Sequence, residues 1–231
     1  MGSEVEACQR PCRTPPAMHI WSIGDYRAHR KENALSEVDI ALSIALGIGL
    51  AAATGFRVFL PMLITSAAAY SGHLPLGENF AWLGTAPALA MLGVAAVVEI
   101  LAYYIPGVDN LLDTLATPAA FVAGTIVSAA VMADVSPMLK WTTAIIAGGG
   151  IAGVTQGVTA LLRAKSTMFT AGVGNPVIAT AELGGSLLVS LLALAAPIIA
   201  VVVVAVFLWL AIRLIRKLTR RASPAKTEAG G

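Results

Sequence analysis

Between Ile40 and Ile212 the chain holds only four basic and six acidic side chains, and this scarcity of charge constrains its fold more than any other feature. Charged residues make up 12% of the whole sequence, whereas a soluble domain typically has about 25%. Hydrophobic residues make up 57%. Such a segment cannot surround a soluble core with polar groups, so the sequence predicts that its solvent is lipid.

The other charged residues gather at the two ends of the chain. This distribution predicts a polar cytosolic tail at 1–38, a transmembrane domain at 39–212 and a basic cytosolic tail at 213–231. The net charge is +2, and the basic excess directly follows an apolar span. We therefore expect the lipid bilayer as a partner and no nucleic acid.

The first apolar run, residues 40–70, is too long for one straight span. As a single helix it would measure about 46 Å, whereas the hydrocarbon layer of a bilayer is about 30 Å thick. Gly55 and Arg57, followed by Pro61, indicate a break inside the run.

Turn residues and charged residues divide the rest of the apolar sequence into further spans. Three spans are expected at 81–104, 116–132 and 138–162. Residues 166–212 fit two more helices, near 175–195 and 197–212, or one re-entrant segment and one long helix. The sequence thus predicts an all-α, polytopic transmembrane helix bundle of about six spans with broken helices.

Basic residues indicate which side of the membrane each loop faces. Arg163, Lys165 and the cluster at 213–221 are expected in the cytoplasm, and the loop at 71–80, which has no Lys or Arg, outside. Six spans satisfy this pattern with both termini cytoplasmic. Five spans would place the most basic segment outside.

Small residues recur every four positions in two places. The first set is Gly47, Ala51 and Gly55, and the second is Gly149, Gly153 and Gly157. This spacing lets helix backbones approach closely, within the chain or in a homo-oligomer. The sets indicate either a 3+3 inverted repeat, as in many secondary transporters, or two separate packing faces.

An ionisable group in mid-membrane costs about 2.5–3.5 kcal/mol, so those that remain are candidates for function. The candidates for a substrate or ion pathway are Arg57, Glu99, Asp109, Asp113, Asn175 and Glu182.

Each candidate near the first break has two interpretations. Glu99 either binds a cation or relays a proton, or is satisfied near the cytoplasmic interface by Tyr103 or a helix end. Arg57 either binds an anion or neutralises Glu99 or Glu182, or extends to the outer interface.

The other candidates also have two interpretations each. Asp109 and Asp113, four positions apart, either bind a divalent cation or pair with Arg57, Arg163 or Lys165, or are solvated in a loop where Asp113 caps the third helix. Asn175 and Glu182 either line a polar site or form an ordinary turn in which Glu182 packs against Arg57 or Ser186.

The sequence contains no motif typical of an enzyme. There is no phosphate-binding glycine loop, no nucleophile motif and no metal-ligand spacing, so we expect no enzymatic activity, no metal and no cofactor. The enzymatic alternative is a lipid-phosphate enzyme that uses Asp109 and Asp113 with a metal.

Several of these strings occur together in a known family. They are Gly55-Phe56-Arg57 with Pro61, Glu99, Pro106 with Asp109 and Asp113, Thr117-Pro118, and Gly174-Asn175-Pro176 with Glu182. Over about residues 40–212 the chain resembles a bacterial family of integral membrane proteins catalogued only as a domain of unknown function. The resemblance implies a multi-pass protein of the bacterial inner (plasma) membrane and supplies no substrate.

Two functions fit these observations. The first is a small transporter or channel for an ion, a proton-coupled solute or a lipid headgroup, which uses intramembrane carboxylates. The second is a non-transporting membrane scaffold or assembly factor, in which the buried charges are structural ion pairs.

Overall fold

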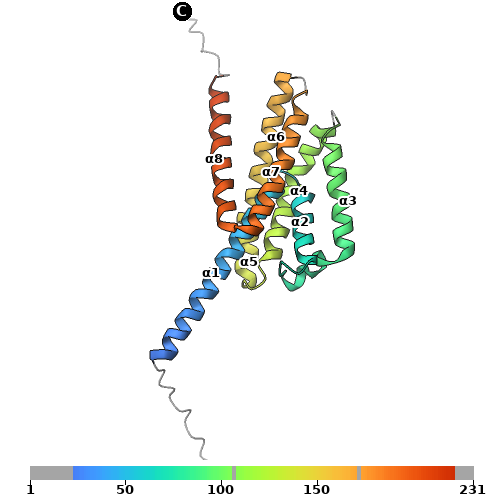
Figure 1. Cartoon of the computed structure of the whole chain (residues 1–231). Coiled ribbons are helices and arrows are strands. Elements are labelled where there is room, and N and C mark those ends of the chain that lie inside the picture. Colours follow the sequence, from blue (N-terminus) through green and yellow to red (C-terminus); the bar gives the residue numbers. More distant parts are fainter. Residues whose placement is uncertain (1–22, 106–107, 171–172, 222–231) are drawn as a thin grey trace, which may run out of the picture. The chain divides into compact units, whose positions relative to one another are not determined.

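The computed structural model describes residues 23–105, 108–170 and 173–221. These residues form helices joined by short turns, with no strand among them, which confirms the predicted all-α class. The chain divides into two compact units, residues 1–37 and residues 38–231. The second unit contains the apolar helices (Figure 1).

Turns or single non-helical residues separate most of the helices. In chain order they are α1 (Ile23–Thr54, of which 38–54 belong to the second unit), α2 (Phe59–Tyr70), η1 (Glu78–Gly84), α3 (Ala86–Ala102), α4 (Val108–Val131), α5 (Pro137–Thr143), η2 (Ala144–Gly149), α6 (Gly150–Thr170), α7 (Asn175–Ala195) and α8 (Pro197–Arg221).

Several of these helices are long and apolar enough to cross a bilayer. Among the described residues there are four such stretches: Glu37–Thr54, Leu111–Val131, Pro137–Met168 and Asn175–Ala195. The pair η1 and α3, bent by 66°, counts as a fifth if it forms one span. The helices fit a multi-pass membrane protein, and the predicted number of about six spans is approximate.

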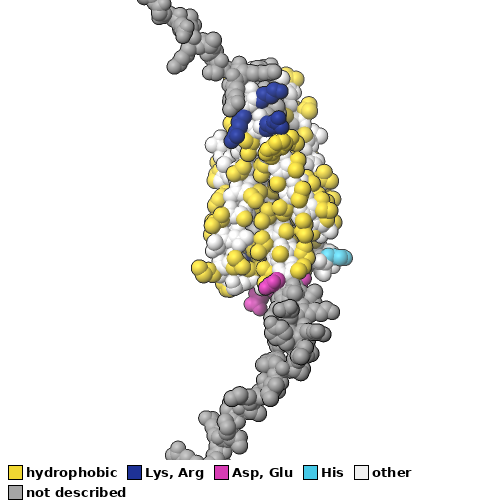
Figure 2. Space-filling view, turned by 90° about the vertical axis from the view of Figure 1, so that its left-hand side faces the viewer, with side chains coloured by type: hydrophobic (Ala, Val, Ile, Leu, Met, Phe, Trp, Pro, Cys, Tyr) yellow, Lys and Arg dark blue, Asp and Glu magenta, His cyan; other side chains and the backbone are white. Residues whose placement is uncertain are grey.

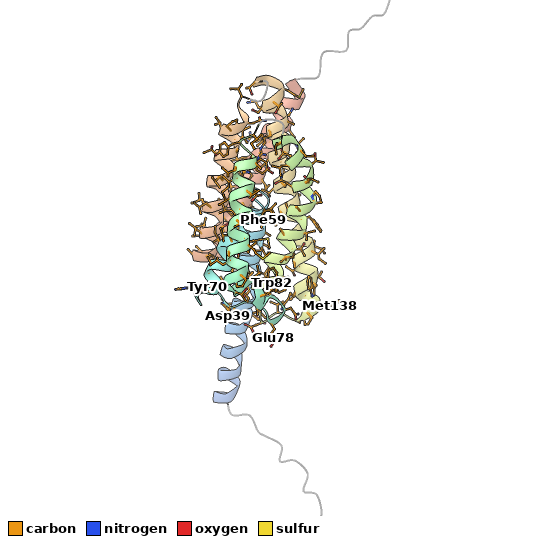
Figure 3. The ribbon with its side chains drawn as sticks, turned by 90° about the vertical axis from the view of Figure 1, so that its right-hand side faces the viewer. Asp39, Phe59, Tyr70, Glu78, Trp82 and Met138 are labelled. Atoms are coloured by element: carbon orange, nitrogen blue, oxygen red, sulfur yellow. The ribbon has the colours of Figure 1, made fainter. Side chains whose placement is uncertain are left out.

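The first apolar run folds back on itself. Asp39 in α1 and Tyr70 at the end of α2 lie at the same end of the second unit, whereas Phe59, where α2 begins, lies midway along it (Figure 3). The predicted break at Gly55 and Arg57 is therefore the turn of a helical hairpin.

The hairpin bears on where the two ends of the transmembrane domain lie. Six crossings would put both ends of the transmembrane domain on one side. In the second unit, Asp39 lies at one end, and the C-terminal end of α8 lies at the other (Figures 1 and 3). The number of crossings and the side of the membrane on which each terminus lies stay predictions.

Two helices begin or end differently from the prediction. The third span was expected to open near Pro118, but α4 begins at Val108 and contains Pro118 in its interior. Asp113 consequently lies within a helix rather than in a loop. The fourth span is extended as well, because α5, η2 and α6 follow one another without a break from Pro137 to Thr170.

The last two helices confirm one of the two interpretations of residues 166–212. α7 begins at Asn175 with a proline in its first turn, and α8 begins at Pro197. Proline suits the first turn of a helix because its missing N–H would have no helical partner there.

α4 packs against η2 and α6, and α2 against α3. Hydrophobic side chains cover the flank of the second unit seen in Figure 2, while basic side chains gather at one end and acidic side chains at the other. An apolar flank between two charged ends is the surface expected of a protein whose middle faces lipid.

Candidate functional site

Arg57 lies in the turn of the hairpin, where the backbone leaves α1. The amides of Gly55 and Phe56 donate to the carbonyls of Ala52 and Ala53 at 3.1 and 3.0 Å. Arg57 is 1% exposed, and its Nη2 donates to the carbonyl oxygen of Ala179 in α7 at 2.9 Å. The guanidinium therefore points into the protein and does not extend to an interface.

Glycine permits this turn to approach α6. A Cβ atom on Gly55 would lie 2.5 Å from the carbonyl oxygen of Ala152, closer than real Cβ atoms come to such an atom. Any larger residue would push the turn away from α6. The position of Arg57 thus depends on the absence of a side chain two residues earlier.

Glu99 holds the beginning of α2. This helix has no side-chain cap from its own N-cap residue. The amides of Val58 and Phe59 instead donate to Glu99 Oε1 and Oε2 at 2.7 and 3.0 Å. The partial positive charge of a helix N-terminus stabilises a carboxylate in this place. The backbone amides at the start of α2 therefore act as the counter-charge of Glu99, which is 8% exposed.

Tyr103 lies against both arginines of the site. The guanidinium carbons of Arg57 and Arg163 are 4.0 and 4.1 Å from the centroid of its ring. Tyr103 is 4% exposed. A desolvated cation–π contact contributes about 2 kcal/mol, so the ring stabilises two like charges that would otherwise repel each other.

Two carboxylates complete the site. Glu182 of α7 forms an ion pair with Arg57 at 3.9 Å and lies directly against the guanidinium of Arg163. Asp113 of α4 accepts a hydrogen bond from Arg163 Nη1 at 2.8 Å. The order Arg57, Glu182, Arg163, Asp113 alternates in sign and is neutral as a whole, so each of these charges has an opposite charge beside it.

The arginines retain unused donors. Arg57 Nε and Nη1 and Arg163 Nε are buried without a hydrogen-bond partner among the described residues. A buried donor left unpaired costs about 1–3 kcal/mol. Opposite charge and stacking on Tyr103 therefore hold the arginines in place more than saturated hydrogen bonding does.

A cavity of about 710 Å³ adjoins this site between α3 and α4, next to the start of α2. Its wall is formed by Val58, Phe59, Ala90, Met91, Val94, Ala95, Val98, Glu99, Ala102, Tyr103, Leu112, Leu115, Ala116 and Ala119. Glu99 and Tyr103 are the polar side chains among them. The cavity is thus apolar except where it meets the charged site.

A second cavity, of about 360 Å³, lies between α4 and α6. Asp113 is the charged residue on its wall, and Gly157 and Leu161 contribute from α6. Neither Arg57 nor Arg163 lines either of these two cavities. The charged groups that reach the two cavities are therefore carboxylates.

The structure brings together four of the six candidate pathway residues, namely Arg57, Glu99, Asp113 and Glu182. Asn175 begins α7, where its amide nitrogen donates to Thr167 Oγ1 at 2.9 Å. Asp109 lies in α4, and its side chain is outside the described residues.

Arg163 and Tyr103 were not among the candidates, although both belong to the site. From the sequence, Arg163 was expected at the cytoplasmic end of a span and as one of the alternative partners of Asp113, and Tyr103 as an alternative partner of Glu99. Two sequence features indicated that these residues belong to the site. Arg163 directly follows an apolar run, and Tyr103 lies one helical turn after Glu99.

The small residues of the two sets lie in unlike settings. A Cβ on Gly47 would meet Ser128 Oγ of α4 at 2.8 Å, and Ala51 is fully buried. Gly149 packs against Phe121 and Thr125, but nothing lies within 4 Å of a Cβ on Gly157. The first set ends in a turn and the second lies in a continuous helix, so the 3+3 inverted repeat stays a prediction.

The chain belongs to the family described as "Domain of unknown function (DUF4126)", whose model matches residues 44–217. The match contains every residue of the charged site, and it confirms the resemblance to a family of unknown function. No curated protein and no solved structure matches the chain.

Proposed function

We propose that the chain is a small membrane transporter or channel, in which a proton or another cation that reaches Glu99 changes the position of the α1–α2 hairpin. One observation supports this proposal above the others. Glu99 lies on the wall of the apolar cavity and at the same time accepts hydrogen bonds from the first amides of α2. A ligand that lies in the cavity therefore competes with the backbone amides of the hairpin for the Glu99 carboxylate.

The free energy of the two hydrogen bonds to Glu99 is large enough to drive a conformational change. A hydrogen bond to a charged group contributes about 1.5–3 kcal/mol, and Glu99 accepts two from α2. Since about 1.4 kcal/mol corresponds to a tenfold change in an equilibrium constant, losing both bonds changes the equilibrium between the hairpin positions by about two orders of magnitude or more.

The hairpin itself is typical of transport proteins. Its turn ends inside the second unit, where Arg57 contacts α7 and the first amides of α2 contact α3. Helices interrupted at membrane depth require protein or water around the free backbone groups, and transporters place their binding sites at such breaks.

We place the basic end of the second unit in the cytoplasm of a bacterial cell, in the inner membrane. This end carries Lys165 together with Arg213, Arg216 and Lys217 of α8, and basic residues mark the cytoplasmic side. Both ends of the hairpin then face the opposite side of the membrane.

Proton movement into liposomes tests the proposal. The purified full chain is reconstituted, a membrane potential is imposed, and a pH-sensitive dye records the internal pH. We expect proton movement with the wild type and loss of it with Glu99→Gln, whereas Glu78→Gln, which changes an exposed carboxylate, retains it. Equal rates for the wild type, Glu99→Gln and empty liposomes would contradict the proposal.

A second function, a membrane scaffold or assembly factor, is favoured by a different observation. Arg57, Glu182, Arg163 and Asp113 alternate in sign and join three helices and the hairpin turn, as structural ion pairs would. Under this function Arg163→Gln, which removes the partner of both Glu182 and Asp113, impairs folding and phenotype, and Glu99→Gln leaves the phenotype unchanged. Loss of phenotype in a folded Glu99→Gln variant favours transport instead.

A further inference from the structure

The geometry points to an amphipathic organic cation as the ligand of the cavity between α3 and α4: its apolar body fills the cavity and its positive group lies against Glu99. This inference names the substrate class of the proposed transport site and therefore rests on the proposed function. It follows from the shape of the cavity, from the sign of the charge on its wall and from the small number of oxygen ligands.

The cavity leads from the lipid-facing surface to the carboxylate. Its rim consists of exposed apolar side chains, with Met91 73%, Val94 66% and Leu115 59% exposed. Its inner wall contains Ala116 and Glu99, 7% and 8% exposed. A ligand that enters from the bilayer thus passes only apolar surface before it meets the charge, which selects molecules that partition into lipid.

The charge on the wall favours a cation over an anion. Glu99 reaches the cavity, whereas Arg57 and Arg163 do not line it and have the ring of Tyr103 against them. An anion in the cavity would lie beside a carboxylate, and its nearest cations would already be paired with Glu182 and Asp113.

The local charges also leave room for a positive ligand. Three carboxylates face two arginines in this site, and the surplus belongs to Glu99, whose counter-charge is the partial charge of the α2 N-terminus. A full positive charge on the ligand compensates Glu99 more completely than backbone amides do.

A metal ion fits the cavity poorly. Hard metal ions bind six or more oxygen ligands, and Glu99 contributes the one carboxylate among the residues that line the cavity. No group of three or more His, Cys, Asp or Glu side chains that could hold a metal occurs in the part of the chain that the structure describes. An organic cation needs one counter-charge, because burial of its apolar surface supplies the remaining affinity.

Binding of radiolabelled tetraphenylphosphonium to the full chain in detergent tests the inference. Two pairs of variants test separately the charge of Glu99 and the free volume of the cavity. Glu99→Gln removes the charge, and Glu78→Gln is its exposed control. Ala95→Phe fills the cavity, and Val97→Phe adds similar bulk to α3 at a position that does not line it. Thermal unfolding of each variant shows that it is folded.

We expect saturable binding by the wild type and both controls, with affinity at least tenfold lower in Glu99→Gln and in Ala95→Phe. Equal affinity of the wild type and folded Glu99→Gln overturns the inference. So does equal competition by an uncharged fatty alcohol, which would identify the occupant as a lipid chain.

The two proposals fail in different ways. If proton movement depends on Glu99 but tetraphenylphosphonium does not bind, the transport function stands and the ligand class is wrong. If tetraphenylphosphonium binds at Glu99 but no Glu99-dependent movement of protons or of the probe occurs in liposomes, the cavity is a binding site and the transport function is wrong.

Discussion

Glu99 Oε1 accepts a hydrogen bond of 2.7 Å from the backbone amide of Val58, a residue 41 positions earlier in the chain. The contact joins α3 to Val58, the N-cap residue of α2, and a second bond from Phe59, the first residue of α2, reinforces it. Helix N-termini need acceptors for their free amides, and here the acceptor comes from another helix. The hairpin and the cavity wall consequently share one side chain.

Replacement of Glu99 by glutamine is expected to weaken the hairpin. A glutamine side chain offers one acceptor oxygen and no charge, so α2 loses one of its two bonds and the charge that favours the other. We expect the free energy of unfolding to fall by about 1.5–3 kcal/mol, measured by thermal or denaturant unfolding in detergent. An unchanged midpoint would show that the two bonds contribute nothing to stability.

Arg163 is expected to be the most sensitive residue of the charged network. It pairs with both Glu182 and Asp113, so Arg163→Gln leaves two carboxylates without their partner. Removing one member of a buried ion pair costs about 3–5 kcal/mol. Asp113→Asn should cost less, since its side chain is 13% exposed and an amide oxygen still accepts a hydrogen bond. Unfolding measurements under the same conditions show which of the two variants loses more stability. A larger loss in Asp113→Asn than in Arg163→Gln would contradict this prediction.

Tyr103 is expected to stabilise the protein through its aromatic ring rather than through its hydroxyl group. Tyr103→Phe keeps the aromatic face against Arg57 and Arg163, and Tyr103→Leu removes it. We expect the leucine variant to be less stable than the phenylalanine variant by about 2 kcal/mol or more, the size of one desolvated cation–π contact. Equal unfolding midpoints for the two variants would exclude stacking as the source of the stability.

Gly55→Ala is expected to displace the hairpin turn. The new Cβ would lie 2.5 Å from the carbonyl oxygen of Ala152, and relief of such a contact costs about 1–3 kcal/mol. Gly157→Ala is the matched control, because nothing lies within 4 Å of its Cβ and α6 gains a better helix former. Unfolding measurements should show opposite signs for the two variants, and a neutral Gly55→Ala would mean that the turn can move freely.

The hairpin itself is open to a labelling experiment. With Cys8 and Cys12 replaced by serine, single cysteines are introduced by Asp39→Cys, Glu78→Cys and Lys217→Cys. A membrane-impermeant maleimide applied to intact cells and to inverted vesicles should reach positions 39 and 78 from one side and position 217 from the other, as their places in the second unit require. Labelling of positions 39 and 78 from opposite sides would mean that the first apolar run crosses the membrane.

The sequence by itself determined the class of the fold and most of its breaks. Apolar stretches with few charges must form helices in lipid, because only a helix satisfies the backbone of a single segment there. Gly55 marked the first break, and Pro197 marked the beginning of the last helix, because the backbone properties of glycine and proline act locally. The cost of burying charge identified Arg57, Glu99, Asp113 and Glu182 in the same way.

Only the tertiary structure decided the direction of the chain after the first break and the partners of the buried charges. The contacts that fix them join residues 41, 50 and 122 positions apart, in the pairs Glu99 with Val58, Arg163 with Asp113 and Arg57 with Ala179. A break at glycine allows either a kink or a reversal, and the choice depends on which helix offers an acceptor to α2. That acceptor is Glu99, and no local pattern predicts its contact with α2, because the contact depends on how α3 packs against α2.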